Sequence, residues 1–222
     1  MTWFCHVRFA HSGSVDDNLP GIRRVCMAVD VEHRSDLSAT DVAAARRQLS
    51  RLLAELCRSP EFDDLLPYRQ RVGDGEVVVL PVGIDEPRTM TSLVNWLVHA
   101  LRRTNSGWVG RHVRLRVAVH EGITTLIGGV FDGPAVKKAC LLLGALPLSA
   151  ALASAPMADL AVLFSDRIYA DLGDLGQCLP EEEVTSVEIG DPAARSQEVG
   201  WLLVPEREPA AGQADAPAAR YG

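Results

Sequence analysis

The sequence lacks the residue patterns that mark several classes of protein. Its five cysteines are odd in number, widely scattered and without a Cys-x-x-Cys pair, which excludes a disulfide framework or a structural zinc site and indicates a reduced, cytoplasmic protein. Basic residues are fewer than acidic ones, 22 against 29. We therefore expect no nucleic-acid partner, because such surfaces neutralise phosphates with Lys and Arg. The N-terminal residues include Arg8, His11 and Asp16, so we expect no secretory signal.

Long uncharged apolar runs are also scarce. Residues 139–158 contain no Asp, Glu, Lys or Arg, but Gly144, Pro147 and Pro156 interrupt them. A core helix followed by a loop explains this stretch better than a membrane span, and we expect no membrane partner. The whole chain of 222 residues, 47% hydrophobic and 23% charged, has the composition of a globular protein that can bury a core.

Hydrophobic periodicity predicts one domain of the α/β class, an α+β sandwich in which helices pack on a single sheet. Residues 1–22 are expected to form an N-terminal arm or edge strand, 23–205 the folded domain, and 206–222 a disordered tail rich in Ala, Pro and Gly. The expected strands are 24–30, 68–72, 76–81, 113–120, 160–164, 184–189 and 199–204, and the expected helices are 38–59, 85–107, 135–146 and 165–172.

Two acidic residues lie where apolar segments end. Asp30 ends the first expected core strand, and Asp74 lies in Gly73-Asp74-Gly75, between two strand-like segments. An Asp-Gly turn, here Asp74-Gly75, flanked by β-branched residues is the strongest local signal for a β-hairpin. If those strands are neighbours, the two carboxylates converge and can hold a divalent ion for phosphate chemistry. The alternative is two ordinary turn aspartates, since turns favour Asp for its local hydrogen bonds.

Five motifs along the chain resemble those of the class III nucleotidyl cyclase catalytic domain, found in adenylate and guanylate cyclases. Residues 30–35, Asp-Val-Glu-His-Arg-Ser, have the family form Asp-[Ile/Val]-x-x-x-[Ser/Thr], and Gly73-Asp74 follows at the separation seen in the family. The later motifs are Arg116-Val-Ala-Val-His-Glu-Gly122, Gly133-Pro-Ala-Val136 with Ala139, and Ser165-Asp-Arg-Ile-Tyr169. Their order and spacing carry the resemblance from about residue 23 to residue 204.

The resemblance implies a ferredoxin-like mixed sheet with helices packed on it, and a site for two Mg²⁺ or Mn²⁺ ions. The metal ligands would be Asp30, Asp74 and the Val31 carbonyl. In the family, the ions activate the ribose 3′-hydroxyl of a nucleoside triphosphate and brace its α-phosphate, which yields a 3′,5′-cyclic nucleotide and pyrophosphate. The loop after Asp30 would cradle the triphosphate with backbone N–H groups. That loop comprises Val31, Glu32, His33, Arg34 and Ser35.

The chain departs from the family at four positions that act on the nucleotide. Gln70 stands where a Lys reads adenine, and Val130 stands where an Asp does so. Lys137 replaces the Asn that orients the ribose, and Leu141 replaces the Arg that stabilises the transition state. Losing such a donor typically costs on the order of 3 kcal/mol or more. For catalysis, Lys137 or Lys138 would have to replace that arginine, without its bidentate fork.

Each active site of the family lies between two chains, and this chain resembles the half that donates the metal ligands. Three hypotheses follow. The chain is an active cyclase, as a homodimer with altered base choice; or it is half of a heterodimer with another cyclase-like chain. The third hypothesis is an inactive pseudo-cyclase that acts as a nucleotide sensor or protein-interaction module.

Overall fold

The computed structural model of the chain describes residues 20–32, 38–62, 65–107, 112–172, 184–190 and 198–205. Residues 1–19 of the expected arm and the expected tail 206–222 lie outside this part, so the domain limits stay predictions.

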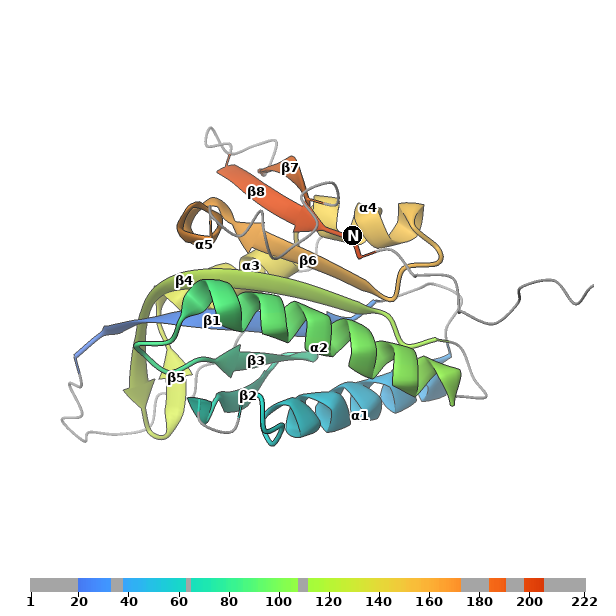
Figure 1. Cartoon of the computed structure of the whole chain (residues 1–222), viewed down its shortest axis with the longest axis horizontal. Helices are drawn as coiled ribbons and strands as arrows, with labels where there is room; N and C mark the ends of the chain where they lie inside the picture. Colours follow the sequence, from blue (N-terminus) through green and yellow to red (C-terminus); the bar gives the residue numbers. More distant parts are fainter. Residues whose placement is uncertain are drawn as a thin grey trace, which may run out of the picture.

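A mixed eight-stranded sheet forms the centre of the fold (Figure 1). Its strand order is β2-β3-β1-β4-β6-β8-β7, and β5 pairs only with β4. All pairs are antiparallel except β4 with β6. The strands are β1 (Ile22–Val31), β2 (Tyr68–Val72), β3 (Gly75–Val79), β4 (Leu115–Ile127), β5 (Val130–Asp132), β6 (Leu160–Ser165), β7 (Val184–Ile189) and β8 (Glu198–Leu203).

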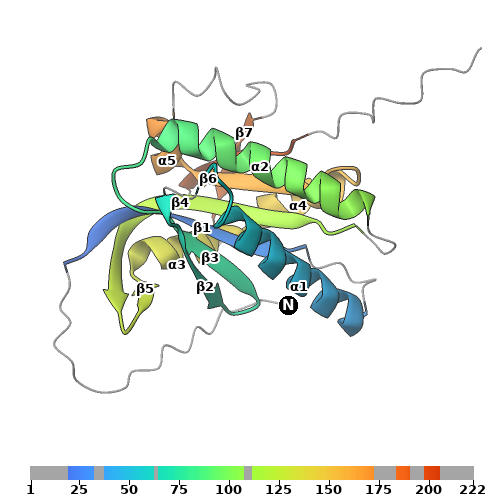
Figure 2. The ribbon, with the colours of Figure 1, turned by 60° about the horizontal axis from the view of Figure 1, so that its bottom comes forward.

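Helices cover both faces of the sheet (Figure 2). On one face, α1 (Ala39–Leu56) and α2 (Glu86–Ser106) bury leucines against Val25, Met27 and Val29 of β1. On the other face, α3 (Pro134–Leu143) and α4 (Leu146–Ser154) pack on smaller side chains such as Ala28 and Ala118. The short helix α5 (Asp166–Asp171) follows β6 directly. This arrangement confirms the predicted α+β sandwich.

Local sequence signals explain where the two long helices begin. The Ser38 hydroxyl accepts a hydrogen bond from the Asp41 N–H at 3.1 Å, and the Asp41 carboxylate accepts one from the Ser38 N–H at the same distance, a complete capping box. At α2, the Asp85 side chain accepts a hydrogen bond from the Arg88 N–H at 3.1 Å, and Pro87 occupies the first turn.

Two predicted boundaries are wrong. The expected helix 135–146 ends at Leu143, and a separate helix begins at Leu146 where a loop was expected, because Pro147 cannot continue an α-helix but fits a first turn. The run Pro134–Ser154 has the length and mean hydropathy (1.5) of a membrane span, but this break divides it into two helices packed on the sheet. The expected strand 113–120 continues to Ile127 and turns back as β5, because Gly128 and Gly129 adopt the positive φ angles of a tight turn.

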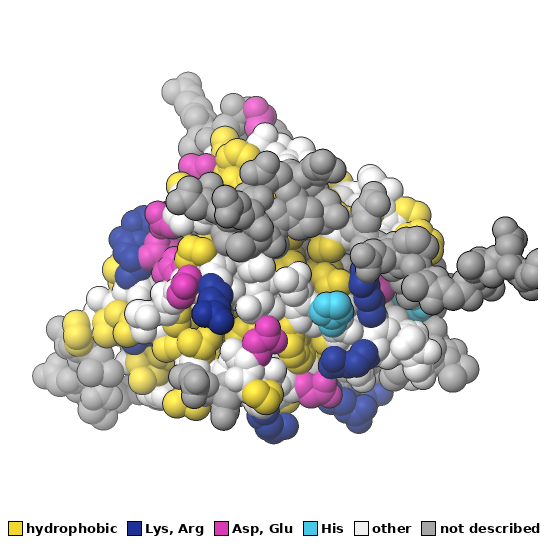
Figure 3. All heavy atoms as spheres, viewed as in Figure 1, with side chains coloured by type: hydrophobic (Ala, Val, Ile, Leu, Met, Phe, Trp, Pro, Cys, Tyr) yellow, Lys and Arg dark blue, Asp and Glu magenta, His cyan; other side chains and the backbone are white. Residues whose placement is uncertain are grey.

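Acidic and basic side chains are interspersed over the face that carries α1 and α2 (Figure 3).

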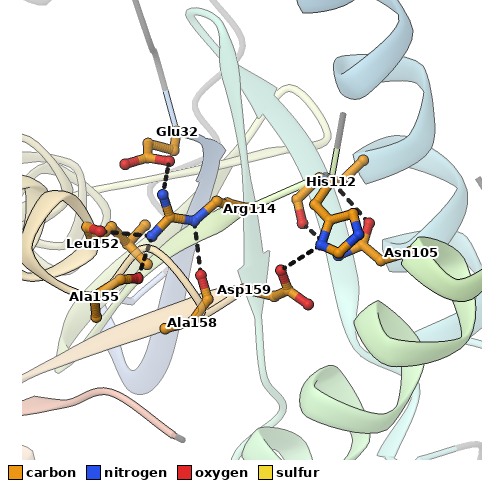
Figure 4. Close-up of polar contacts among 9 residues, drawn as sticks. Glu32, Asn105, His112, Arg114, Leu152, Ala155, Ala158 and Asp159 are labelled. Atoms are coloured by element: carbon orange, nitrogen blue, oxygen red, sulfur yellow. Dashed lines mark hydrogen bonds and ion pairs between the residues drawn. The ribbon is translucent and has the colours of Figure 1, made fainter. Parts of the chain in front are cut away.

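A buried arginine joins three parts of the fold (Figure 4). Arg114, just before β4, donates hydrogen bonds to the carbonyls of Leu152, Ala155 and Ala158 at 2.6 to 2.7 Å. Its Nη1 also lies 2.9 Å from the Glu32 carboxylate, and the two side chains are only 6% and 10% exposed. Since Glu32 directly follows β1, this pair fixes the end of the strand that carries Asp30.

We expect Arg114→Met to lower the free energy of unfolding by about 3 to 5 kcal/mol, because it leaves a buried carboxylate without its partner. Urea denaturation measures this change. The control is Arg103→Met, since the Arg103 side chain is 66% exposed and lies 3.9 Å from Glu55, so its loss is expected to cost less than about 1 kcal/mol. Equal effects of the two substitutions would contradict a structural role for Arg114.

Candidate functional site

Strand pairing brings the two predicted metal-binding segments together. In the antiparallel pair of β1 and β3, Val29 lies opposite Glu76. Continuing this register places Asp30 opposite Gly75 and Val31 opposite Asp74. A Cβ built on Gly75 would lie 3.4 Å from the Asp30 Cβ, which agrees with that register. The turn that bears Asp74 therefore lies beside the strand end that bears Asp30.

Asp30 is held by its own strand and by β4. Its Oδ1 accepts a hydrogen bond from the Val31 N–H at 2.7 Å, and its Oδ2 lies 3.2 Å from Nη2 of Arg116, its cross-strand partner. The Arg116 guanidinium also donates to the Ser149 hydroxyl of α4 at 2.9 Å. Because the Asp30 side chain is only 13% exposed, a nearby positive charge is needed to stabilise its ionised form.

Asp74 lies in the two-residue loop between β2 and β3. Gly73 has a φ of 60°, whereas Asp74 does not have a positive φ, since Leu66 is the one non-glycine residue with positive φ in the described part of the chain. The loop is therefore a type II′ turn with glycine first. Asp74 Oδ2 lies 2.8 Å from Nη2 of Arg46 on α1, and half of the Asp74 side chain is exposed. The hairpin was predicted, but its turn is Gly73-Asp74 and not Asp74-Gly75.

These residues fit a divalent ion that prefers oxygen ligands. The described ranges hold no group of three or more His, Cys, Asp or Glu side chains arranged for a metal. Mg²⁺ nevertheless commonly binds through one or two carboxylates plus substrate phosphates. The Val25 carbonyl accepts a hydrogen bond from the Leu80 N–H, just after β3. Because every second residue of an antiparallel strand directs its carbonyl to the same neighbouring strand, the Val31 carbonyl lies on the side of β1 that faces Asp74.

Part of the predicted triphosphate cradle is engaged within the protein. The Val31 N–H donates to Asp30, and the Glu32 N–H donates to the Arg114 carbonyl at 2.8 Å. The Glu32 carboxylate pairs with the Arg114 guanidinium. His33, Arg34 and Ser35, the rest of the predicted cradle, lie outside the described residues.

The two predicted base-reading positions lie near the β4–β5 hairpin. Gln70 donates to the Phe131 carbonyl at 2.7 Å and accepts from the Phe131 N–H at 2.9 Å, so its amide joins β2 to β5. The Tyr68 hydroxyl donates to the Gly129 carbonyl, and the Tyr68 and Phe131 rings meet edge to face at 5.1 Å. Val130 is 46% exposed beside this contact.

The predicted catalytic lysines lie elsewhere in the chain. Lys137 Nζ is 3.6 Å from Asp132, and Lys138 pairs with Glu198. Ala135, at the start of the same helix, packs against Gly122, which lies opposite Arg24. Arg24 precedes Asp30 by six residues of β1, so at the rise of a strand the two lie about 20 Å apart. One chain therefore does not bring the lysines to the aspartates.

Two of the later sequence motifs meet in the sheet. His120 Nδ1 and the Ser165 hydroxyl form a hydrogen bond of 2.8 Å between β4 and β6. Burial lowers the pKa of His120, and the positive charges of Lys138 and Arg167 lower it further. A neutral His120 is thus favoured, which suits a residue that links two strands.

Arg46 and Arg116 are the site residues that sequence reasoning missed. Arg116 belonged to a recognised motif, but only the strand register places it opposite Asp30. Arg46 lies 28 residues before Asp74, and no local pattern connects them.

Solved structures with the same architecture include nucleotidyl cyclases. An adenylate/guanylate cyclase/hydrolase from Silicibacter pomeroyi has a TM-score of 0.55 at 19% identity, with 84% of this chain and 99% of that chain covered. The chain has the class III nucleotidyl cyclase catalytic fold. No protein-family model matches the sequence, and neither does any curated protein.

Two further structures share the cyclase fold. The catalytic core of a rhodopsin-guanylyl cyclase with converted specificity, in complex with ATPαS, gives a TM-score of 0.53 at 12% identity and covers 83% of this chain and 96% of its own. The non-canonical dimeric guanylyl cyclase domain of the RhoGC fusion protein from Blastocladiella emersonii gives a TM-score of 0.50 at 12% identity and covers 83% of this chain and 97% of its own. At these identities the likeness concerns the fold.

Gly75→Ala is expected to destabilise the protein by about 1 to 3 kcal/mol, because the new methyl group would lie 2.6 Å from the Val29 carbonyl oxygen and force the strands apart beside Asp30. Thermal denaturation measures the loss. Gly107→Ala is the control, since the nearest atom to a Cβ there is 3.9 Å away. A neutral Gly75→Ala variant would contradict the close approach of the two segments.

Proposed function

We propose that this chain binds a metal–nucleoside triphosphate complex at the site formed by Asp30, the Val31 carbonyl and Asp74. The observation that supports this most is the β1–β3 register, which places residues 30 and 31 beside the turn of Asp74 within a cyclase fold. Mg²⁺ or Mn²⁺ held there would supply charge neutralisation for the phosphates and a lowered pKa for the ribose 3′-hydroxyl. The predicted loop 31–35 would contact the triphosphate.

Conversion to a 3′,5′-cyclic nucleotide requires groups that one copy of this chain does not bring to the aspartates. Lys137 and Lys138 lie on α3, near the other end of β1. A second chain is therefore part of the proposal, either another copy or a different cyclase-like chain. The dimeric domain of the RhoGC fusion protein is a precedent for assembly, and the rhodopsin-guanylyl cyclase core in complex with ATPαS is one for nucleotide binding.

The hypothesis of a heterodimer with another cyclase-like chain is favoured by one observation on α3. Leu141, at the position of the family arginine, is 69% exposed and has no part in the core. A homodimer would place this uncharged side chain where the transition state needs a bidentate cation, so its turnover would be low. A partner chain with that arginine would complete the site, and without one the chain acts as a nucleotide-binding pseudo-cyclase.

Nucleotide binding is tested by thermal denaturation with Mn²⁺ and each of the four nucleoside triphosphates. At a ligand concentration of about 100 times Kd, the expected stabilisation is roughly 2.7 kcal/mol. Asp30→Asn and Asp74→Asn should each abolish it, because they remove a charged metal ligand at nearly constant shape. Asp171→Asn, an exposed carboxylate on α5, is the control. Stabilisation that survives in both site variants would place the metals elsewhere.

Restoring the family pair tests the missing catalytic groups. The double substitution Lys137→Asn with Leu141→Arg should raise the rate of cyclic nucleotide formation by a factor on the order of 100 over the unmodified chain. The rate is measured by separating the products of labelled nucleotides. Leu146→Arg is the matched control, since Leu146 is 77% exposed on the neighbouring helix. An unchanged rate, or an equal rise in the control, would contradict the assignment of these two positions.

A further inference from the structure

The two candidate metal ligands are each paired with an arginine. Asp30 pairs with Arg116 from the neighbouring strand, and Asp74 pairs with Arg46 from α1. The two pairs differ in exposure. The Asp30 and Arg116 side chains are 13% and 17% exposed, whereas Asp74 and Arg46 are 50% and 33% exposed. The Arg46–Asp74 pair is thus the more accessible of the two to solvent and to a ligand.

Arg46 has hydrogen-bonding capacity to spare. Its Nη2 contacts Asp74 at 2.8 Å, while its Nε is buried and has no hydrogen-bond partner among the described residues. A guanidinium carries five N–H donors and binds phosphate oxygens well. The side chain comes from α1, whose N-terminal cap, Ser38, lies three residues after the end of the predicted triphosphate loop 31–35. Arg46 therefore contacts one candidate metal ligand directly, and it lies on the helix that follows the segment expected to bind the phosphates.

The charges of these four residues predict which ligands the site accepts. The charges of the two carboxylates and the two guanidinium groups sum to zero. A free divalent ion would leave the site with two uncompensated positive charges, and it would compete with Arg46 for Asp74. Two divalent ions with a triphosphate of about four negative charges would leave the sum at zero.

We propose that Arg46 makes the site selective for the metal–triphosphate complex over the free metal ion. This inference rests on the proposed metal–nucleotide site. In the ligand-free state Arg46 serves as the counter-ion of Asp74. With Asp74 engaged as a metal ligand, the Arg46 guanidinium would turn donors to the triphosphate. Arg46 is a binding residue in this role, and no step of catalysis depends on it.

The test compares two probes that need no knowledge of the base. Binding of Mn²⁺ alone is measured from the electron paramagnetic resonance signal of the free ion, and binding of Mn²⁺ with inorganic tripolyphosphate is measured by calorimetry. Arg46→Ala should bind Mn²⁺ alone roughly three- to tenfold more tightly and the Mn²⁺–tripolyphosphate complex more weakly by a similar factor, because one positive charge is lost beside a partly exposed carboxylate. Arg46→Lys should restore part of the selectivity.

Arg47→Ala is the matched control, because it removes the same charge from an exposed position on the same helix. It should leave both affinities unchanged. If Arg46→Ala behaves as Arg47→Ala does, or weakens the binding of both ligands equally, the proposal that Arg46 provides selectivity is wrong while the proposed site stands. If the unmodified protein binds neither Mn²⁺ nor its complexes with tripolyphosphate and the four nucleotides, the proposed function itself fails.

Discussion

The antiparallel pairing of β1 with β3 is the constraint on which the candidate site depends. Because the side chains of a strand alternate with a period of two, a shift of one residue would turn every buried valine of these strands to the wrong face. The core therefore fixes the register, and the register places the end of β1 beside the Gly73-Asp74 turn. Arg114 secures the same strand end by holding Glu32 and the chain between α4 and β6.

Arginines provide the charge balance of this region. Two aspartates at neighbouring strand ends would repel each other if nothing compensated them, and Arg116 and Arg46 supply that compensation in the fold described. A site neutralised in this way is stable without a metal ion. In the proposed site, two divalent ions that arrive with a triphosphate leave the local charge unchanged, whereas an ion alone does not, and this would link nucleotide binding to metal binding.

Much of the fold was predictable because its signals are local. Capping residues marked the starts of α1 and α2, and alternation marked the strands. A break at Pro147 was expected, but helix α4 after it was missed, because Pro147 and Pro156 were interpreted as signs of a loop. The β4–β5 hairpin was missed because the expected strand ended at residue 120, whereas the strand continues to Ile127, and Gly128 and Gly129 form the turn that carries β5 back to β2.

The candidate site was predictable only in its acidic half. Asp30 and Asp74 stood out because each ends an apolar segment, and the family motifs gave their spacing. Arg46, Arg116 and the contact of Gln70 with Phe131 depend on which elements pack together, and they lie 28 to 86 residues from their partners. Contacts over such separations are set by tertiary packing and leave no local pattern in the sequence.

The most direct test is crystallographic. Crystals grown with Mn²⁺ and a non-reactive nucleoside triphosphate analogue would be measured at the manganese absorption edge, which locates the ion independently of the protein atoms. The account predicts an anomalous peak within about 2.3 Å of oxygens from both Asp30 and Asp74. Nucleotide bound elsewhere, with both carboxylates still paired to their arginines and no ion beside them, would contradict it.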